Sequence, residues 1–246
     1  ALVAKSAPDG HVLFVGSSPG FVNALALSKD AGYDPGRDFA AVSLLATQAM
    51  LLTLHPSLAP NTLQDFLPFV RSQPGKFSYA TPGIGTPHHM AMELLKHTAG
   101  LDIVHVPYRS APAALSDIMN GNVQMMIDAI TTMAPNVRAG KLKGLAVSIS
   151  RRLEKFPEIP TMQESGLPGY EAYTWEAYTW FGFAVPAGTP ADIVAQINEG
   201  FNKGLQDDGA RSRIEAIGIR LGGGSPQDFD RHIRSEMDKW GQVIRK

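Results

Sequence analysis

Short apolar segments alternate along this chain with amphipathic segments that begin at a capping residue, and this alternation restricts the fold more than any other feature. Strands are expected in seven mostly apolar runs bounded by turn residues: His11 to Gly16, Met50 to His55, Phe77 to Thr81, Ile103 to Val106, Gln124 to Asp128, Leu142 to Ser148 and Trp180 to Val185. Regular alternation of strand and helix is typical of parallel-rich sheets covered by helices on both faces. The predicted fold class is therefore α/β.

Five helix starts share one signal, a Ser or Thr at the N-cap with Pro or an acidic residue in the first turn. They lie at Thr62, Thr86, Ser110, Thr189 and Ser225. Apolar residues at helical spacing follow these starts. The last stripe predicts a long C-terminal helix and consists of Phe229, Ile233, Met237, Trp240 and Ile244.

The stretch from Ser78 to Met92 reads as a short strand, a glycine turn and a capped helix. Gly83 and Gly85 let the backbone come close to a ligand, and Thr86 followed by proline favours a helix start. The free N–H groups of a first helical turn, with the helix dipole, attract a carboxylate or a phosphate. The turn predicts an anion site, and an ordinary strand-to-helix connection is the alternative.

Composition and motifs argue against several functional classes. With 22 basic and 23 acidic residues the net charge is -1, so no nucleic-acid partner is expected. The absence of cysteine removes disulfides, thiol catalysis and cysteine-bound metals. The sequence given shows no signal peptide and no apolar run long enough to cross a bilayer, so we expect a soluble protein.

Enzymatic chemistry is also disfavoured by the motifs. A metal site built from His88, His89 and His105 is unfavourable because adjacent side chains diverge by about 100° around a helix. The sequence contains neither a phosphate-binding loop nor a Gly-x-Ser-x-Gly elbow, and its glycine turn lacks the third glycine of a dinucleotide fingerprint. We therefore expect no enzyme activity, no cofactor and no metal.

Polar residues follow several of the expected strands. In sheets of this class, ligands gather where the carboxyl ends of neighbouring strands meet. The residues at such positions are Ser17, Ser18, Thr81, Tyr108 and Asp128. Hydroxyls, a phenol and a carboxylate suit a small polar ligand.

Segments distributed in order over nearly the whole chain resemble the Bug-type receptors, the periplasmic solute-binding proteins of tripartite tricarboxylate transport systems. The matching segments are Ala7-Pro8-Asp9-Gly10, Tyr33-Asp34-Pro35, Ser78-Tyr79-Ala80, Gly83-Ile84-Gly85-Thr86-Pro87-His88-His89, Val104-His105-Val106-Pro107-Tyr108, Ala139-Gly140-Lys141-Leu142, Gly166-Leu167-Pro168-Gly169-Tyr170 and Pro186-Ala187-Gly188-Thr189-Pro190. The resemblance implies a two-lobe fold of the type II-like periplasmic-binding-protein kind. It also implies capture of a small organic acid, a mono- or dicarboxylate of aliphatic or aromatic character, by a periplasmic monomer that serves the membrane components of a tripartite transporter.

The resemblance places a first lobe at 1–47 and 180–246, a second lobe at 48–179, and a hinge near 43–54 and 175–186. Two features differ from the family pattern. The usual strands, loop and helix before Ala7 are missing from the sequence given, so the first lobe lacks its N-terminal strands in this sequence, and either the sequence is incomplete or the protein differs there. In addition, Glu-Ala-Tyr-Thr-Trp occurs twice, at 171–175 and 176–180, and we expect the second copy to lie in the strand.

Carried over residue by residue, the resemblance makes Gly83, Ile84, Gly85 and Thr86 the carboxylate loop, adjoining Thr81. It places Ser17 and Ser18 on a second ligand loop and Tyr108 and Trp180 on the walls of the site, with a core role equally open for Trp180. It makes Asp128 a selector for an amino or hydroxyl group, with a helix N-cap as the alternative. The alternative functions are a ligand-sensing adaptor for a periplasmic signalling protein and a metal-dependent enzyme.

Overall fold

The computed structural model describes residues 1–22, 32–149, 151–167, 170, 178–216 and 219–244, with the backbone alone at 178–179 and 239–244. The chain divides into two compact units. The first contains Ala1–Thr47 and Thr179–Lys246, and the second contains Gln48–Tyr178. Strand β2 (Phe39–Leu54) contributes residues to both units, and each unit is described separately below.

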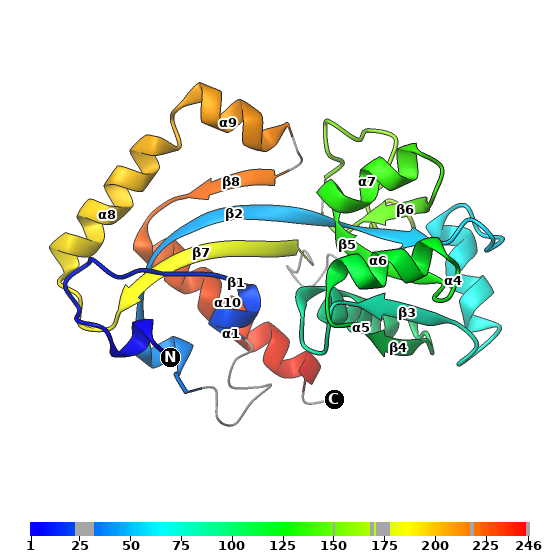
Figure 1. Ribbon diagram of the computed structural model, residues 1–246, viewed down its shortest axis with the longest axis horizontal. Helices are drawn as coiled ribbons and strands as arrows, with labels where there is room; N and C mark the ends of the chain where they lie inside the picture. The colour runs from blue at the N-terminus through cyan, green and yellow to red at the C-terminus, as the bar shows by residue number, and fades with distance from the viewer. Residues whose placement is uncertain (23–31, 150, 168–169, 171–177, 217–218, 245–246) are drawn as a thin grey trace. The chain divides into compact units, whose positions relative to one another are not determined.

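The second unit alternates strands and helices along the chain (Figure 1). After β2 its elements are α4 (Leu63–Arg71), β3 (Ser78–Thr81), α5 (Pro87–Ala99), β4 (Val104–Pro107), α6 (Ala111–Met119), β5 (Met125–Ala129), α7 (Ile130–Arg138) and β6 (Lys143–Val147). Strand β3 pairs in parallel with β4 and β5, whereas β2 pairs antiparallel with β5 and β6. The α/β class is confirmed, and the sheet is mixed: the expected parallel pairing describes β3, β4 and β5 rather than every strand.

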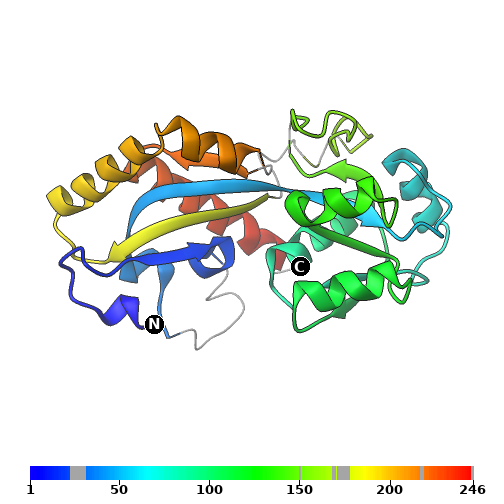
Figure 2. The ribbon, with the colours of Figure 1, turned by 45° about the horizontal axis from the view of Figure 1, so that its top comes forward.

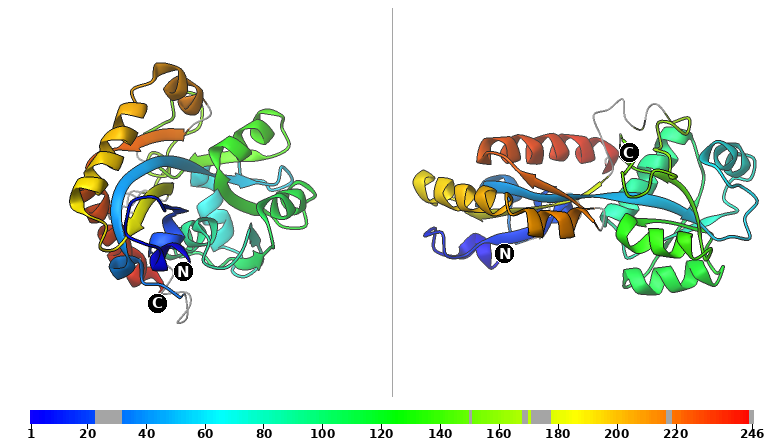
Figure 3. Two further views of the ribbon diagram at one scale, coloured as in Figure 1. Left: turned by 60° about the vertical axis from the view of Figure 1, so that its left-hand side comes forward. Right: turned by 90° about the horizontal axis from the view of Figure 1, so that it is seen from above.

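Helices cover both faces of this second-unit sheet, as the view from above in Figure 3 shows. On one face, alternate β2 residues such as Leu52 and Leu54 pack with buried residues of α4 and α5, including Phe66 and Met92. On the other face, Leu51 packs with buried residues of α6 and α7. The period-two alternation along β2 therefore feeds two hydrophobic cores, as expected for a strand covered on both sides.

The first unit is built from two separate parts of the chain. Its elements are the 3-10 helix η1 (Val3–Lys5), β1 (Phe14–Ser17), α1 (Ser18–Val22), α3 (Pro35–Asp38), the first part of β2, β7 (Tyr178–Pro186), α8 (Ala191–Gly204), α9 (Asp208–Glu215), β8 (Ile219–Gly223) and α10 (Pro226–Ile244). Strand β1 pairs antiparallel with β7, and β7 lies between β1 and β2, as Figure 2 shows. Strand β8 also pairs with β2.

Alternate residues of β7 build the two cores of the first unit. Phe183 and Val185 pack with Val194 of α8. On the opposite side, Trp180 contacts Phe21 and Phe229, with ring centroids 5.4 and 5.7 Å away. Gly182, on the same side of the strand, leaves room for the Phe229 ring, because a side chain there would overlap it.

All five predicted helix starts are confirmed, four of them with the predicted capping residue. The side chains of Thr62, Thr86 and Ser110 accept hydrogen bonds from the third residue after each of them, and Ser225 forms a reciprocal pair with Asp228. At Thr189 the helix start is confirmed, because α8 begins at Ala191, but the predicted capping residue is wrong. The N-cap of α8 is Pro190, and the Thr189 hydroxyl instead donates to the Pro186 carbonyl at 2.8 Å, which closes the preceding turn.

Other predicted features are partly met. The second Glu-Ala-Tyr-Thr-Trp copy enters β7 with Tyr178, Thr179 and Trp180, whereas the first copy, 171–175, lies outside the described residues. Strand β2 has 16 residues and starts well before the predicted Met50. In the described part of the chain, no helix combines the length and the apolar character needed to cross a membrane.

Candidate functional site

The candidate site is built around the turn that joins β3 to α5 in the second unit. Gly83 and Gly85 have φ values of 143° and 73°, which side chains strongly disfavour. The Thr86 hydroxyl donates to the Gly83 carbonyl at 2.8 Å and accepts from the His89 N–H at 3.4 Å. One threonine therefore caps α5 and fixes the shape of the turn.

The hydrogen bonds of this turn use some of its backbone N–H groups and leave others open. The Gly83 N–H donates to the Thr81 hydroxyl at 3.3 Å, and the Gly85 N–H donates to Nδ1 of His89 at 3.2 Å. The backbone N–H groups of Ile84, Thr86 and His88 donate no hydrogen bond to any residue that the structure describes. These groups stand at the positive end of a 13-residue helix, the arrangement that favours an anion.

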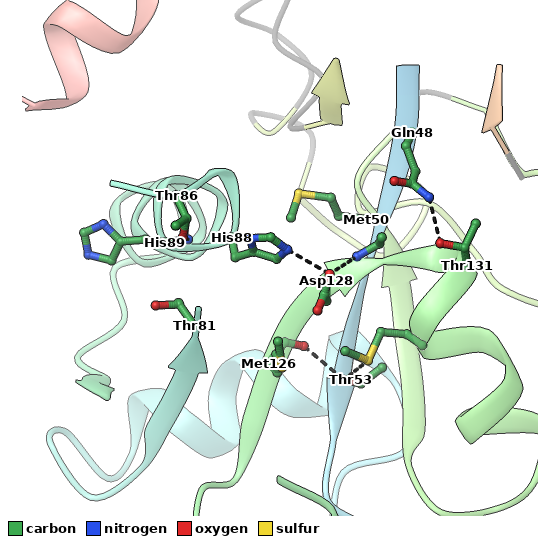
Figure 4. A network of polar contacts seen from close by, with 12 residues as sticks. Gln48, Met50, Thr53, Thr81, Thr86, His88, His89, Met126, Asp128 and Thr131 are labelled. Atoms are coloured by element: carbon green, nitrogen blue, oxygen red, sulfur yellow. Dashed lines mark hydrogen bonds and ion pairs between the residues drawn. The ribbon is translucent and has the colours of Figure 1, made fainter. Parts of the chain in front are cut away.

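A buried carboxylate lies close to the same helix start (Figure 4). Asp128 is at the end of β5, and its side chain is only 5% exposed. Its Oδ1 lies 2.8 Å from Nε2 of His88 and accepts the Ala129 N–H at 2.6 Å. Its Oδ2 has no hydrogen-bond partner among the residues that the structure describes, and neither has Nδ1 of His88.

The position of Asp128 excludes one of its two earlier interpretations, the helix N-cap. The N-cap of α7 is Ala129, and no side chain caps that helix. Asp128 is therefore not the N-cap, and its carboxylate instead faces the first turn of α5. An incompletely paired carboxylate in a buried position is costly, which makes it a candidate for contact with a ligand.

Figure 4 shows two polar side chains in the same region that were not among the predicted ligand-binding residues, Gln48 and His88. Gln48 donates to the Thr131 hydroxyl at 2.7 Å, and His88 holds Asp128. The useful signal for His88 was its place in the first turn of a helix that follows a glycine turn. Gln48 carries no such local signal, because its partner is 83 residues away in sequence.

Behind the turn, three aromatic rings form a stack in the order Tyr79, His105, His89. Ring centroids are 4.8 Å apart between Tyr79 and His105 and 4.2 Å apart between His105 and His89. Nε2 of His105 lies 2.6 Å from the Thr81 hydroxyl. Burial lowers the pKa of His105 to about 4 and also lowers the pKa of His89, so both imidazoles are neutral at neutral pH.

Tyr108, predicted to wall the site, follows β4 and is tied to α6. Its hydroxyl donates to Asp117 at 2.7 Å, and burial, followed by that hydrogen bond, raises the pKa of Tyr108 to about 12. Its backbone N–H donates to the carbonyl of Thr81 at 2.8 Å. The residue therefore adjoins the turn through its backbone, while its hydroxyl is already engaged.

Three predicted site residues lie in the first unit. Ser17 ends β1 and the buried Ser18 begins α1. Trp180 is fully buried, and its indole N–H donates to Glu236 at 3.2 Å. This burial favours the core interpretation of Trp180, and a role in the wall of the site stays a prediction.

The two adjacent histidines of α5 have different partners, as expected from their angular separation. Figure 4 shows them leaving the helix on opposite sides, His88 toward Asp128 and His89 away from it. Among the described residues, no group of three or more His, Cys, Asp or Glu side chains is placed to hold a metal ion.

Comparison with known proteins places the whole chain in one family. The model of the tripartite tricarboxylate transporter family receptor (TctC) matches residues 1–246. A UPF0065 protein from the tcbD-tcbE intergenic region of Pseudomonas sp. (strain P51) is 34% identical over 99% of this chain and 71% of its own length. Protein BugT of Bordetella pertussis is 28% identical over 99% of this chain and 73% of its own length.

Solved structures give the same result. The R. palustris protein Rpa4515, solved with adipate, has a TM-score of 0.86 and 33% identity and covers 99% of this chain and 80% of its own. MatC from Rhodopseudomonas palustris, with bound malate, has a TM-score of 0.83 and 30% identity and covers 99% and 82%. The periplasmic binding protein BugD has a TM-score of 0.83 and 26% identity and covers 99% and 80%.

These similarities confirm a fold of the periplasmic-binding-protein type, and the family is one of solute-binding receptors rather than enzymes, which removes the metal-dependent alternative. The chain therefore belongs to the tripartite tricarboxylate transporter receptor family, as a receptor of the Bug type.

Proposed function

We propose that this protein captures a small organic acid, as its carboxylate, in the periplasm and presents it to the membrane components of a tripartite transporter. The observation that carries the proposal is the set of open backbone N–H groups at the start of α5. Ile84, Thr86 and His88 offer donors to an anion without the cost of ordering long side chains. Each such contact contributes about 0.3 to 1 kcal/mol, and more where water is excluded.

The class of ligand is supported by the solved relatives. One was solved with adipate and another with bound malate, and both ligands are aliphatic dicarboxylates. A dicarboxylate is therefore the first candidate for this chain. Monocarboxylates and aromatic acids carry the same anchoring group and belong in the same test.

We assign Asp128 the recognition of a donor group on the ligand, such as a hydroxyl or an amino group. Its Oδ2 accepts hydrogen bonds and is unpaired among the described residues. Because this oxygen is buried, the contact requires a neighbouring side chain such as His88 to shift when the ligand enters. The ligand screen therefore compares the stabilisation by hydroxy acids and amino acids with the stabilisation by unsubstituted diacids of the same length.

The remaining predictions do not concern the turn and Asp128 in the second unit. Ligand contacts from Ser17 and Ser18, a hinge near 43–54 and 175–186, and a monomeric state stay predictions. The transporter partner and the periplasmic location rest on membership of the family.

The test is a thermal-shift screen against adipate, L-malate, aromatic acids, amino acids and divalent cations. A ligand present at one hundred times its Kd adds about 2.7 kcal/mol of stability, which raises the Tm of a chain of this size by about 5 to 10 °C. A rise confined to carboxylates, and reduced in Thr86→Ala, supports the proposal. A transition that no acid moves, or that only a metal moves, contradicts it.

A further inference from the structure

One backbone N–H group of the turn, that of Gly85, already has a hydrogen-bond acceptor within the protein. The Gly85 N–H points to Nδ1 of His89, 3.2 Å away, although its neighbours on either side remain open. Gly85 has a positive φ of 73°, a conformation that glycine leaves easily in the absence of a fixed contact. The orientation of the adjoining peptide groups therefore depends on what holds this N–H.

The imidazole that holds it is fixed in place on its other face. His89 stacks on His105 at 4.2 Å, and His105 stacks on Tyr79 at 4.8 Å. His105 also contacts the Thr81 hydroxyl at 2.6 Å, and that hydroxyl accepts the Gly83 N–H. Both glycines of the turn are thus connected to one stack of three rings.

The stack is held at its far end by charged side chains. The Tyr79 hydroxyl donates to Glu93 at 2.5 Å, and Lys96 donates to the same carboxylate oxygen at 2.6 Å. The Lys96 ammonium also lies 5.5 Å from the centroid of the Tyr79 ring. These contacts leave the rings little freedom to rotate away from the turn.

We propose that His89 is a positioning residue. Its Nδ1 accepts the hydrogen bond of the Gly85 N–H, and this contact keeps the N–H groups of Ile84 and Thr86 directed at the ligand carboxylate. The inference rests on the proposed function, because it concerns the geometry of the same carboxylate loop. It also fixes the tautomer: an Nδ1 that accepts a hydrogen bond must be unprotonated, so the ring proton is on Nε2. Burial lowers the pKa of His89, which agrees with a neutral ring.

Two variants separate the hydrogen bond from the ring. His89→Asn keeps an acceptor close to the position of Nδ1 and removes the stacked ring, whereas His89→Phe keeps the ring and removes the acceptor. His97→Phe is the matched control, because His97 is an exposed histidine of the same helix. Thermal unfolding of each variant shows whether it is folded.

Affinity for adipate and for L-malate is then measured by calorimetry. Loss of the hydrogen bond predicts binding about tenfold weaker in His89→Phe, whereas His89→Asn stays within about threefold of the unmodified protein. His97→Phe binds normally. Equal losses in both His89 variants, or normal binding in His89→Phe, would overturn the inference, since the acceptor would then have no special role.

A second readout needs no ligand and separates this inference from the proposed function. Imidazole nitrogen-15 shifts of the free protein report which nitrogen of His89 carries the proton, and unprotonated Nδ1 is expected. If the unmodified protein binds neither acid, the proposed function loses its support. A protonated Nδ1 overturns the positioning role whether or not an acid binds.

Discussion

His88 and Asp128 are 40 residues apart in sequence and meet at 2.8 Å, Nε2 to Oδ1. The contact joins the first turn of α5 to the end of β5. The carboxylate is almost fully buried and the imidazole is 17% exposed, and the histidine shares the carboxylate oxygen with the Ala129 N–H. The pair therefore links the helix that carries the proposed carboxylate loop to the neighbouring strand.

Removal of one partner from this pair is expected to cost more than removal of both. His88→Leu leaves Asp128 with a buried, poorly satisfied carboxylate and should lower the free energy of unfolding by about 1–3 kcal/mol. Adding Asp128→Leu should recover part of that loss, with a coupling energy of about 0.5–3 kcal/mol in a urea-unfolding double-mutant cycle. The exposed His97 provides the control substitution. Strict additivity of the two changes would show that the contact carries no stability.

Thr86→Ala is expected to weaken both the start of α5 and the binding of acids. The hydroxyl caps the helix and holds the Gly83 carbonyl, so its loss should cost about 1–2 kcal/mol of stability and a similar amount of binding energy. Thr62→Ala is the matched control, because Thr62 caps α4 in the same manner. The control should lose stability and keep its affinity. Equal affinities in Thr86→Ala and the unmodified protein would show that the turn is not the carboxylate site.

Local signals in the sequence predicted the turn, and long-range contacts explain what they missed. The Thr86 hydroxyl caps α5 through the N–H of a residue three positions away, so the cap can be identified from a short segment of sequence. Thr189 carries the same signal and a helix begins two residues later, but its hydroxyl bonds the Pro186 carbonyl and Pro190 takes the N-cap position. A capping motif thus locates a helix start, but it identifies the capping residue only where no nearby turn competes for the hydroxyl.

The side chains around Asp128 show what local sequence signals do not predict. Its position after a strand indicated a site residue, yet the contact with His88 depends on the packing of α5 against the sheet. Trp180 is similar: its burial follows from Phe21 and Phe229, which come from both ends of the chain. Pairings across such distances leave no periodic signal, and a single sequence does not reveal them.

Trp180→Phe should separate a core role from a ligand role. The change removes volume and the indole N–H that donates to Glu236, so the free energy of unfolding should fall by about 1–3 kcal/mol. Affinity for acids, measured well below the unfolding transition, should not change, because Trp180 has no exposed surface. Phe183→Leu, a second core change in the same strand, is the comparison. A selective loss of affinity in Trp180→Phe alone would return Trp180 to the ligand site.

Acid should destabilise this protein in a window set by the stacked histidines. Burial lowers the pKa of His105 from the ordinary 6.5 to about 4, so the unfolded chain takes up a proton at a higher pH than the folded protein does. Stability from this residue is therefore complete above about pH 6.5, falls as the pH drops toward 4, and changes no further below that. His105→Phe keeps an aromatic ring in the stack and removes the titration, so its unfolding free energy should depend less steeply on pH between 6.5 and 4. Carboxylates such as Glu93 titrate in both proteins, and their contribution cancels when the two slopes are subtracted. Parallel slopes for the two proteins would contradict the lowered pKa, because an imidazole that titrates alike in folded and unfolded chains contributes no pH dependence.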